Sequence, residues 1–511
     1  MSETLALDPV GAAGEAPHRH ELRGNGISGA GAIVMAVAGS APAYSIAATT
    51  PLLIGTAGLA SVASLLWCGI PMLGIAFAFA YLGRSDVNAG AAYSWVGRAL
   101  HPSLGFLSGW SLVVSATIFM VSGALPAGQF TLQLINPALT SNTWLVTGVG
   151  AVWFLVMLAL VVFGVTVTAL AQWIMSSIEV GILVIVAVAA LIKGFSGSGV
   201  HTAFSWSWFG FAHFGSAGTF ATAALIAAFY FWGWDVSANL NEETSNGHKA
   251  SGRGGIVGVF IVFALFLVFT TATQVLLPNH QATGTNAIID LGHAIFPGWG
   301  GTALIIAAML STIATLETTL IQASRTLFAM GRDNTIPRVF GTTARRWKTP
   351  AFATLIVGVV AVGLFIGSNS LGSVSTIMTD AVDSIGFQIT FYYSLAAAAV
   401  VVTYRRQLFR SVKTFLLVGL WPAIGALFMA WAFVQSLISD WGDWVVIGIG
   451  IGSIVVGLFL VWGFWGRARS YYTKRPLEPE NEIVPATNPI DLSMRAELVD
   501  ADHPEEEELH A

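Results

Sequence analysis

The chain has 511 residues, of which 55% are hydrophobic and only 10% are charged, and its mean hydropathy is +0.74. Soluble domains carry about 25% charged residues, so this composition excludes an ordinary soluble protein and predicts an all-α polytopic membrane protein. The formal net charge is −5, and the chain ends in the acidic segment HPEEEELHA. A nucleic-acid partner is not expected from this balance of charge.

Twelve stretches are long and apolar enough to cross a membrane as helices, because one crossing takes roughly 20 apolar residues. They lie near residues 27–54, 58–82, 103–135, 144–164, 167–193, 217–240, 254–277, 299–330, 350–367, 376–403, 415–437 and 443–466. Together they predict one membrane domain over residues 25–466. Residues 1–24 and the polar, acidic tail 467–511 are expected to be disordered and cytoplasmic.

The basic residues predict the orientation, because lysine and arginine accumulate in cytoplasmic loops. Twelve crossings that start inside the cell place all but one of the 22 basic residues on the cytoplasmic side, and Lys193 is the exception. A miscounted span would scramble this partition, so both termini are expected to be cytoplasmic. No cleaved signal peptide is recognisable, and the first span is expected to insert the chain into the cell membrane.

The first span is interrupted at GSAPAYS, residues 39–45. Pro42 lacks a backbone N–H group and clashes with the preceding turn, so the helix is expected to break there. The second span holds the single cysteine, Cys68. One cysteine excludes an intramolecular disulfide, and Cys68 is expected to pack as a small residue.

Two acidic residues fall in the middle of predicted spans, Glu179 in the fifth and Glu317 in the eighth. An unpaired carboxylate is costly in a membrane, so each is expected to be protonated, paired or next to water. One interpretation is proton handling. The other is a structural hydrogen bond between helices, which for Glu179 would reach the first span.

The sixth span is interrupted in the corresponding place, by Trp232-Gly233-Trp234-Asp235. Either break alone is compatible with a simple kink between packed helices. Two breaks five spans apart predict two five-helix repeats of opposite orientation, whose broken helices point to a binding site near the middle of the bilayer. Exposed amides and half-helix N-termini can hold a carboxylate or another ion there. Asp235 could cap the half-helix that follows it or form a cytoplasmic gate, and of the two a cap is expected.

Three segments carry a family resemblance. They are SDVNAGAAYSWVGRALHPSLGFLSGW (85–110), the sixth-span turn followed by Asn239 and the pair Glu242-Glu243, and LSTIATLETTLIQASRTLFAMGRDNTIPRVF (310–340). In this order and on these spans, residues 25–466 resemble the amino acid-polyamine-organocation superfamily of secondary transporters. The resemblance implies ten core helices in two inverted repeats, as in neurotransmitter-sodium symporters, plus two peripheral helices.

The resemblance also implies alternating access, with an amino acid or amine bound between the broken helices. Seven residues would then form the substrate site: Gly39, Ser40 and Ala41 through amides that face its carboxylate, Phe229 as an outer lid, and Trp232, Gly233 and Trp234 around its ammonium and side chain.

The sequence departs from the family pattern in three places. Ala41 and Pro42 follow Ser40 where relatives often continue with glycine, and Trp232 stands where many keep a small residue. Glu179 stands where several sodium-independent relatives have a lysine. A carboxylate cannot supply the positive charge of that lysine.

The expected function is therefore proton-coupled uptake of an amino acid, with no enzyme activity, cofactor or metal. Four residues are candidates for ion coupling, two as proton carriers and two as hydroxyl ligands for sodium: Glu317, Glu179, Ser311 and Thr312. The hydroxyl groups have a structural alternative, since serine and threonine commonly join membrane helices. The expected partners are the solute, a proton or sodium ion, and the lipid bilayer.

Other functions are weighed against this one. A diamine or polyamine transporter or exchanger is favoured by Asp235, Glu317 and the pair Asp380 and Asp383 near the outer start of the tenth span, although acids also suit a helix N-terminus. A channel or non-transporting nutrient sensor of the same fold stays open. A membrane enzyme or redox carrier would need histidine or cysteine clusters within the spans, whereas all ten histidines fall in predicted loops or tails.

Overall fold

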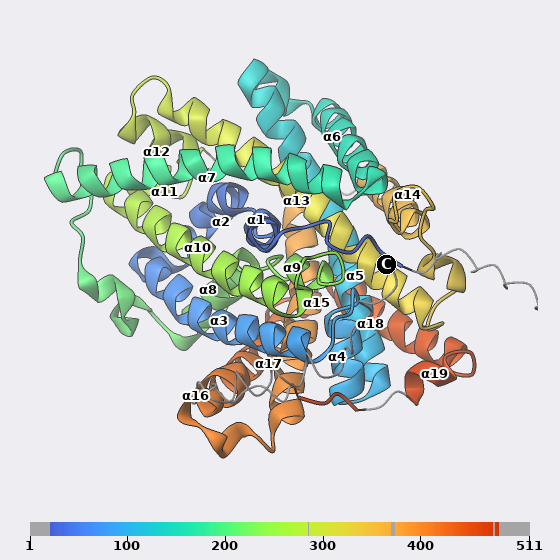
Figure 1. Ribbon diagram of the computed structural model, residues 1–511. Helices are drawn as coiled ribbons and strands as arrows, with labels where there is room; N and C mark the ends of the chain where they lie inside the picture. Colours follow the sequence, from blue (N-terminus) through green and yellow to red (C-terminus); the bar gives the residue numbers. More distant parts are fainter. Residues whose placement is uncertain (1–20, 285, 369–373, 474–475, 480–511) are drawn as a thin grey trace, which may run out of the picture.

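The structure is a computed structural model that describes residues 21–284, 286–368, 374–473 and 476–479. Within these ranges the chain is helical and has no β-strand, apart from one isolated bridge between Ile27 and Thr244 (Figure 1). Ten helical stretches of the described residues are long and apolar enough to cross a membrane. The predicted all-α polytopic membrane protein is confirmed.

The α-helices are α1 (Gly29–Gly39), α2 (Pro42–Ala57), α3 (Ser61–Ser85), α4 (Ala92–Ala99), α5 (Pro102–Ile135), α6 (Thr143–Phe163), α7 (Val165–Ser196), α8 (Ala217–Tyr230), α9 (Val236–Asn239), α10 (Gly247–Leu276), α11 (Asn279–Ala282), α12 (Ala287–Ile295), α13 (Gly300–Arg332), α14 (Ala351–Ser368), α15 (Val374–Tyr404), α16 (Val412–Thr414), α17 (Trp421–Ser439), α18 (Trp444–Phe464) and α19 (Arg469–Tyr472).

The predicted number of twelve crossings is not settled by these helices. One of the ten stretches, Gly29–Ser85, contains α1, α2 and α3, while the apolar helix α8 is shorter than the others. The count of twelve and the arrangement in two inverted repeats therefore stay predictions.

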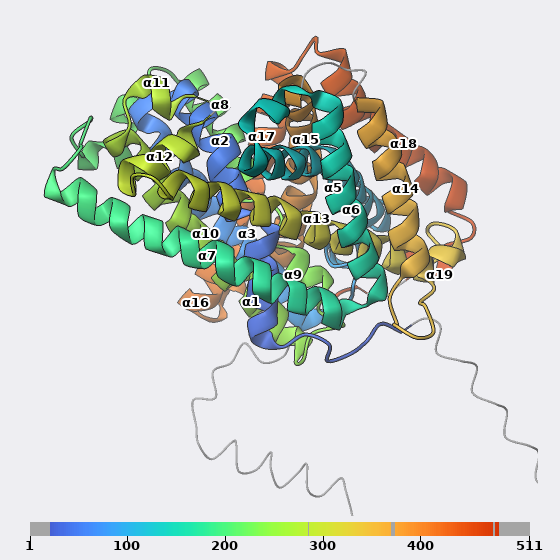
Figure 2. The same ribbon diagram turned by 90° about the horizontal axis from the view of Figure 1, so that it is seen from above.

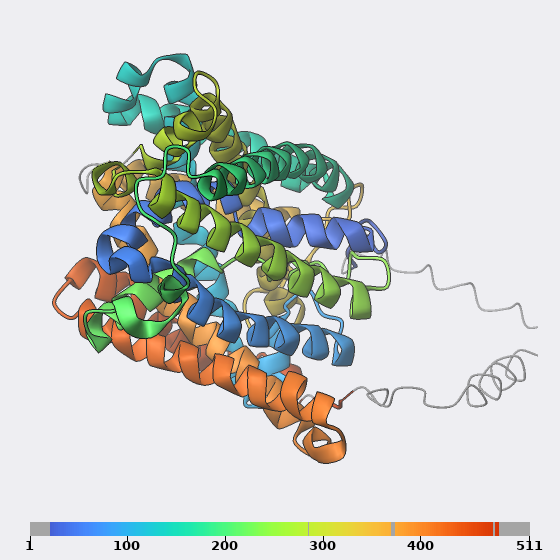
Figure 3. The same ribbon diagram turned by 90° about the vertical axis from the view of Figure 1, so that its left-hand side faces the viewer.

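The long helices α5 and α13 pack against each other through the middle of the molecule. On one side of them, α10 lies between α1 and α3 (Figure 3). The helix α15 packs against α5, α17 and α18, and both α15 and α17 also contact α3. The outer helices carry exposed apolar side chains, among them Leu170 on α7, Val359 on α14 and Trp462 on α18, which suits a surface covered by lipid.

The first span is broken between α1 and α2. Ser40 and Ala41 connect the two helices, and Pro42 is the first residue of α2. Ala41 has a φ of 46°, a left-handed conformation that residues with a Cβ atom rarely adopt. Pro42 suits the first helical position, because an N–H group there would have no helical partner. The break is therefore a turn between two helices rather than a bend in one.

The sixth span is broken between α8 and α9. Residues 231–235 form a turn between them, and Gly233 at its centre has a φ of 95°. This conformation favours glycine. The half-helix before the first break, α1, and the half-helix after the second break, α9, lie toward one end of the bundle (Figure 2). The other two half-helices, α2 and α8, lie toward the opposite end.

The two breaks touch through their backbones. A Cβ atom added at Gly39 would lie 2.2 Å from the carbonyl oxygen of Gly233, and one added at Gly233 would lie 2.2 Å from the carbonyl oxygen of Gly39. Neither position leaves room for a side chain, which explains the glycine at both. The predicted interruptions of the first and sixth spans are thus both present, and they meet in one place.

We expect Gly39→Ala to destabilise the protein by about 1–3 kcal/mol, the usual cost of an extra methyl group in a packed interior. The added group would meet backbone atoms, so no side-chain rotation relieves the clash. Gly181→Ala on α7 is the matched control, because a Cβ atom there meets nothing within 4 Å. Thermal unfolding in detergent compares the two variants, and equal melting temperatures would contradict a required contact between the breaks.

Candidate functional site

A buried carboxylate lies beside the meeting point of the two breaks. Asp235, two residues after Gly233, is fully buried. Its Oδ1 accepts a hydrogen bond from the hydroxyl of Tyr393, and its Oδ2 accepts one from the hydroxyl of Tyr392, both at 3.0 Å. The predicted capping role is wrong, since the side chain makes no capping bond to α9. Within the described residues no lysine, arginine or histidine forms an ion pair with Asp235.

Aromatic rings enclose this carboxylate. The indole N–H of Trp232 donates to the hydroxyl of Tyr392 at 2.8 Å. The ring of Trp234 stacks on Tyr393 with a centroid distance of 5.8 Å, and the rings of Tyr392 and Tyr393 are 4.5 Å apart. Ring faces attract cations. The two tyrosines are not among the residues predicted from the sequence, although two adjacent tyrosines in the middle of an apolar span are an unusual signal.

A pocket of about 280 Å³ lies between α2, α8, α15 and α17, at the end that is predicted to face outward. Phe229, half-buried near the end of α8, is one of its walls, while Asp383 and Asp440 give it two acidic groups. Phe229 therefore lies between this pocket and the breaks along α8. Its role as an outer lid stays a prediction.

The amides predicted to face a substrate carboxylate have partners inside the protein. The N–H of Ser40 donates to the carbonyl of Val37 at 3.1 Å, and the N–H of Ala41 donates to that of Ala38 at 3.1 Å. Both amides thus complete the last turn of α1. In this conformation neither is free to bind a solute.

The N-terminus of α2 is capped by side chains from two other helices. Glu179 on α7 accepts the N–H of Ala43 with Oε1 at 3.0 Å, and Ser311 on α13 accepts the N–H of Tyr44 with Oγ at 3.2 Å. The bond to the first span that the structural interpretation of Glu179 expects is present, while its role in ion coupling stays a prediction. Thr312, the other predicted hydroxyl ligand, donates to the carbonyl of Met309 in its own helix.

A line of buried polar groups continues from Glu179 between α7 and α13. Gln172 and Ser176 share one face of α7 with Glu179 because they lie seven and three residues before it. The amide of Gln172 donates to Glu317 Oε2 at 2.8 Å. Four buried oxygens along this line have no partner within the described residues: Gln172 Oε1, Ser176 Oγ, Glu179 Oε2 and Glu317 Oε1. These four oxygens can accept hydrogen bonds from protonated groups or from water.

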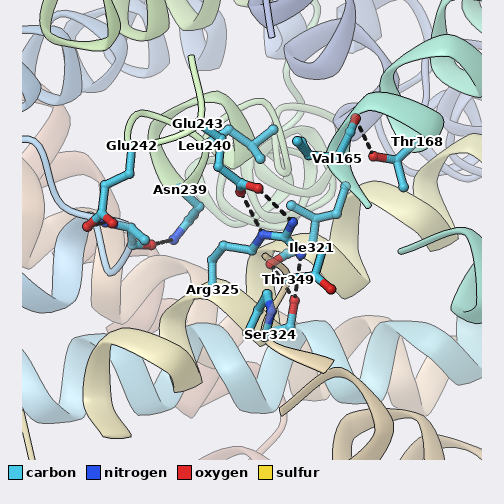
Figure 4. Close-up of polar contacts among 12 residues, drawn as sticks. Val165, Thr168, Asn239, Leu240, Glu242, Glu243, Ile321, Ser324, Arg325 and Thr349 are labelled. Atoms are coloured by element: carbon cyan, nitrogen blue, oxygen red, sulfur yellow. Dashed lines mark hydrogen bonds and ion pairs between the residues drawn. The ribbon is translucent and has the colours of Figure 1, made fainter. Parts of the chain in front are cut away.

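An ion-pair cluster closes the end of the breaks that is predicted to face the cytoplasm (Figure 4). Arg325 on α13 binds Glu243 with two hydrogen bonds, Nε to Oε2 at 2.9 Å and Nη2 to Oε1 at 3.1 Å, and both side chains are fully buried. Arg332 binds Glu242 at 2.7 Å nearer the surface. In the sequence these residues stand out only as parts of segments that resemble the family. These pairs could have been predicted from the sequence, because an arginine buried in an apolar span is stable only beside an acidic partner.

A second contact strengthens this closure. The hydroxyl of Tyr93 on α4 donates to Asp333 at 3.1 Å, and Tyr471 on α19 stacks on the ring of Tyr93 at 4.9 Å. Burial raises the pKa of Tyr93 well above its ordinary value, and Tyr471 and Asp333 raise it further, so the hydroxyl remains a donor at neutral pH. The folded chain thus continues past residue 466. The disorder predicted for residues 1–24 and 467–511 falls largely outside the described residues and stays a prediction.

A family model described as amino acid permease matches residues 27–464. The chain is 26% identical to the low-affinity putrescine importer PlaP of Escherichia coli over 57% of this chain and 64% of that protein. It is 25% identical to the vacuolar cationic amino acid transporter 2 of Arabidopsis thaliana, over 62% of this chain and 52% of that protein. It is 25% identical to the methylthioribose transporter of Bacillus subtilis, over 79% of this chain and 86% of that protein. The matches to the first two thus span less than two thirds of those proteins.

We expect Arg325→Ala to destabilise the protein by about 3–5 kcal/mol, because it leaves the carboxylate of Glu243 buried and unpaired. Arg332→Ala is the matched control. Its partner is partly exposed, so its loss should cost at most about 1 kcal/mol. Thermal unfolding in detergent measures both, and equal losses would contradict the different environments of the two pairs.

Proposed function

This chain belongs to the amino acid permease family and is a membrane transporter of that type, and from that premise we propose that it takes up a cationic amine across the cell membrane by alternating access. The ammonium group binds at Asp235, and protons drive the uptake. Diamines and amino acids with a basic side chain carry such a group. Twelve crossings with both termini in the cytoplasm are part of the same proposal.

The observation that carries the proposal is the environment of Asp235. A carboxylate buried without a cation is costly, and two tyrosine hydroxyls compensate only part of that cost. An ammonium group brought by the solute would supply the missing charge. The rings of Trp232 and Trp234 beside the carboxylate favour a cation as well.

The first break argues for the amine over a zwitterionic amino acid. The amides of Ser40 and Ala41 donate to α1, and those of Ala43 and Tyr44 donate to Glu179 and Ser311. A solute carboxylate would have to displace these partners, whereas a diamine would not.

An amino acid is nevertheless the second candidate, because the family description names amino acids. Two of the relatives are named for putrescine, a diamine, and for cationic amino acids. An amino acid with a basic side chain would place that side chain at Asp235 and require some opening of the first break.

Proton coupling is supported by the different partners of the two acidic side chains, each of which keeps one oxygen unpartnered among the described residues. Glu179 caps α2, so its Oε1 is committed to the backbone of the first span. Glu317 is held by one amide hydrogen bond and keeps Oε1 unpartnered among the described residues. We therefore assign the proton to Glu317 and a positioning role to Glu179. Sodium is less well supported, since the hydroxyl of Thr312 faces its own helix.

Alternating access is supported by the difference between the two ends of the site. The predicted cytoplasmic end is closed by the pairs of Arg325 with Glu243 and Arg332 with Glu242. The predicted outer end has a pocket that reaches Phe229. Release of the solute into the cell would require the ion pairs to separate while the outer pocket closes.

Uptake by purified protein in proteoliposomes tests the proposal. Labelled putrescine and lysine are offered under an inward proton gradient and, separately, under an inward sodium gradient. Accumulation driven by protons supports the proposal. Saturable binding of these solutes without any flux would favour the sensor of the same fold, and flux without saturation would favour a channel.

We expect Asp235→Asn to lower kcat/KM for amine uptake by at least about tenfold, because the loss of a charge-assisted contact costs about 1.5–3 kcal/mol. Asp383→Asn in the outer pocket is the matched control and should change uptake less. Unfolding curves verify that both variants are folded. An Asp235→Asn variant with the affinity of the wild type would remove Asp235 from the solute site.

We expect Glu317→Gln to abolish proton-driven accumulation while largely preserving exchange of labelled for unlabelled solute. Glutamine has nearly the same shape and can still accept a bond from Gln172, but it cannot carry a proton. Glu179→Gln is the control, since an amide oxygen can still accept the N–H of Ala43. Equal loss of accumulation and exchange in Glu317→Gln would refute a role in coupling.

A further inference from the structure

The segment that follows the last candidate span folds back onto the end of the bundle that the ion-pair cluster closes. Tyr471 on α19 is buried there. Its hydroxyl donates to the carbonyl oxygen of Pro102 at 3.1 Å and to that of Tyr93 at 3.3 Å. Leu477, further along the chain, is also buried, and its N–H donates to the carbonyl of Arg98 at 3.4 Å. Residues beyond the membrane domain thus bind the short helix α4.

Tyr471 occupies a slot that two glycines leave open. A Cβ atom added at Gly97 on α4 would lie 2.4 Å from the hydroxyl oxygen of Tyr471, and one added at Gly105 on α5 would lie 2.5 Å from it. For Gly97 this hydroxyl is the nearest obstacle, whereas Gly105 also meets the backbone of Gly97. Glycine in a helix interior is less stable than alanine, and neither glycine has the left-handed conformation that would require it. The glycine at position 97 is therefore explained by the tyrosine that it admits.

The helix that Tyr471 contacts is itself bonded to both sides of the closed end. The ring of Tyr471 stacks on that of Tyr93, whose hydroxyl donates to Asp333 directly after α13. Ala89, in the turn before α4, donates its N–H to Glu242 Oε1 at 2.8 Å, in the segment that follows α9. The helix α4 and the turn before it therefore link the end of α13 to the segment after α9.

We propose that Tyr471 is a positioning residue for transport. In its slot it holds α4 against the end of α13 and the segment after α9, and it leaves the slot when the cytoplasmic end opens. The segment after the last span thereby controls how often that end opens. This inference rests on the proposed alternating access, but it is independent of the identity of the solute and of the coupling ion.

A cysteine introduced at Thr326 measures the opening directly. Thr326 on α13 is fully buried, and its hydroxyl accepts the side-chain amide of Asn239 on α9 at 3.1 Å, so separation of α9 from α13 exposes it. Full-length protein with Cys68→Ala and Thr326→Cys is placed in lipid nanodiscs, and its labelling by a polar maleimide is timed without solute. Tyr471→Phe loses both hydrogen bonds but keeps the ring, so labelling should be about twofold to tenfold faster. Tyr471→Ala should accelerate it further.

Filling the slot tests the same contact from its other side. Gly97→Ala leaves the C-terminal segment unchanged, but its methyl group takes the place of the hydroxyl, so it should accelerate labelling about as much as Tyr471→Ala. Added to Tyr471→Ala it should have no further effect, because both changes act through one contact. Tyr472→Phe is the matched control. Tyr472 stacks on Trp465 with a centroid distance of 4.0 Å instead of entering the slot, so labelling should stay at the wild-type rate.

Two further measurements separate this role from a general loss of stability. Cys68 is buried on α3, and its thiol donates to the carbonyl of Ala224 on α8. In variants that keep Cys68 and Thr326, its labelling reports unfolding of the bundle and should not change. Arg332→Ala removes a different contact at the same end, so it should also accelerate labelling of Thr326→Cys. Should Tyr471→Ala fail to fold, Tyr471→Phe decides, because it removes a single oxygen atom.

Three results would overturn the proposal. The first is an unchanged labelling rate in the Tyr471 variants while Arg332→Ala labels faster, which leaves alternating access intact. The second is an unchanged rate in the Tyr471 variants and in Arg332→Ala alike, which contradicts the opening of this end and the proposed alternating access with it. The third is equal acceleration at Cys68 and at Thr326→Cys, which would show that Tyr471 only stabilises the fold.

Discussion

The backbone contact between Gly39 and Gly233 determines where every other part of the candidate site can lie. Two half-helices from distant parts of the chain end against each other there, and neither position has room for a methyl group. The contact fixes the start of α2 close to α7 and α13. It also places Asp235, two residues beyond Gly233, in front of the tyrosines of α15. A change at the contact would shift both sets of partners at once.

Around this contact the protein balances its buried charges in three different ways. Arg325 and Glu243 neutralise each other through two hydrogen bonds. Glu179 is stabilised by a backbone amide at the start of a half-helix, where the helix dipole favours an anion. Asp235 accepts hydrogen bonds from two tyrosine hydroxyls and has the amide of Gln322 nearby, all of them neutral groups. The first arrangement is neutral without a ligand, and the second ties Glu179 to a helix N-terminus although its Oε2 has no partner among the described residues. Asp235 is bound to neither a cation nor a helix N-terminus within the described residues, and this difference distinguishes the proposed binding group.

The sequence was sufficient for the parts of this structure that depend on local chemistry. Pro42 and the glycine between two tryptophans predicted both breaks, since a residue without an N–H group and one with free dihedral angles each interrupt a helix where they stand. The all-α membrane fold followed from composition. The partners of the acids could not be predicted in the same way. Asp235 meets Tyr392 and Tyr393 about 157 residues further along the chain, and only the packing of α15 against the broken span brings them together. The amides of Ser40 and Ala41 were assigned to a solute because sequence alone does not reveal that α1 keeps its last turn.

The central claim is that the two breaks form one site for a cationic amine, and counterflow in proteoliposomes tests it most directly. Vesicles with the purified protein are loaded with each of the twenty amino acids or a diamine, and the entry of the same labelled compound is measured without any ion gradient. The account predicts acceleration by diamines or basic amino acids and none by neutral or acidic amino acids. Acceleration by neutral amino acids alone would contradict it, because such solutes bring no charge for Asp235 beyond the one that balances their own carboxylate.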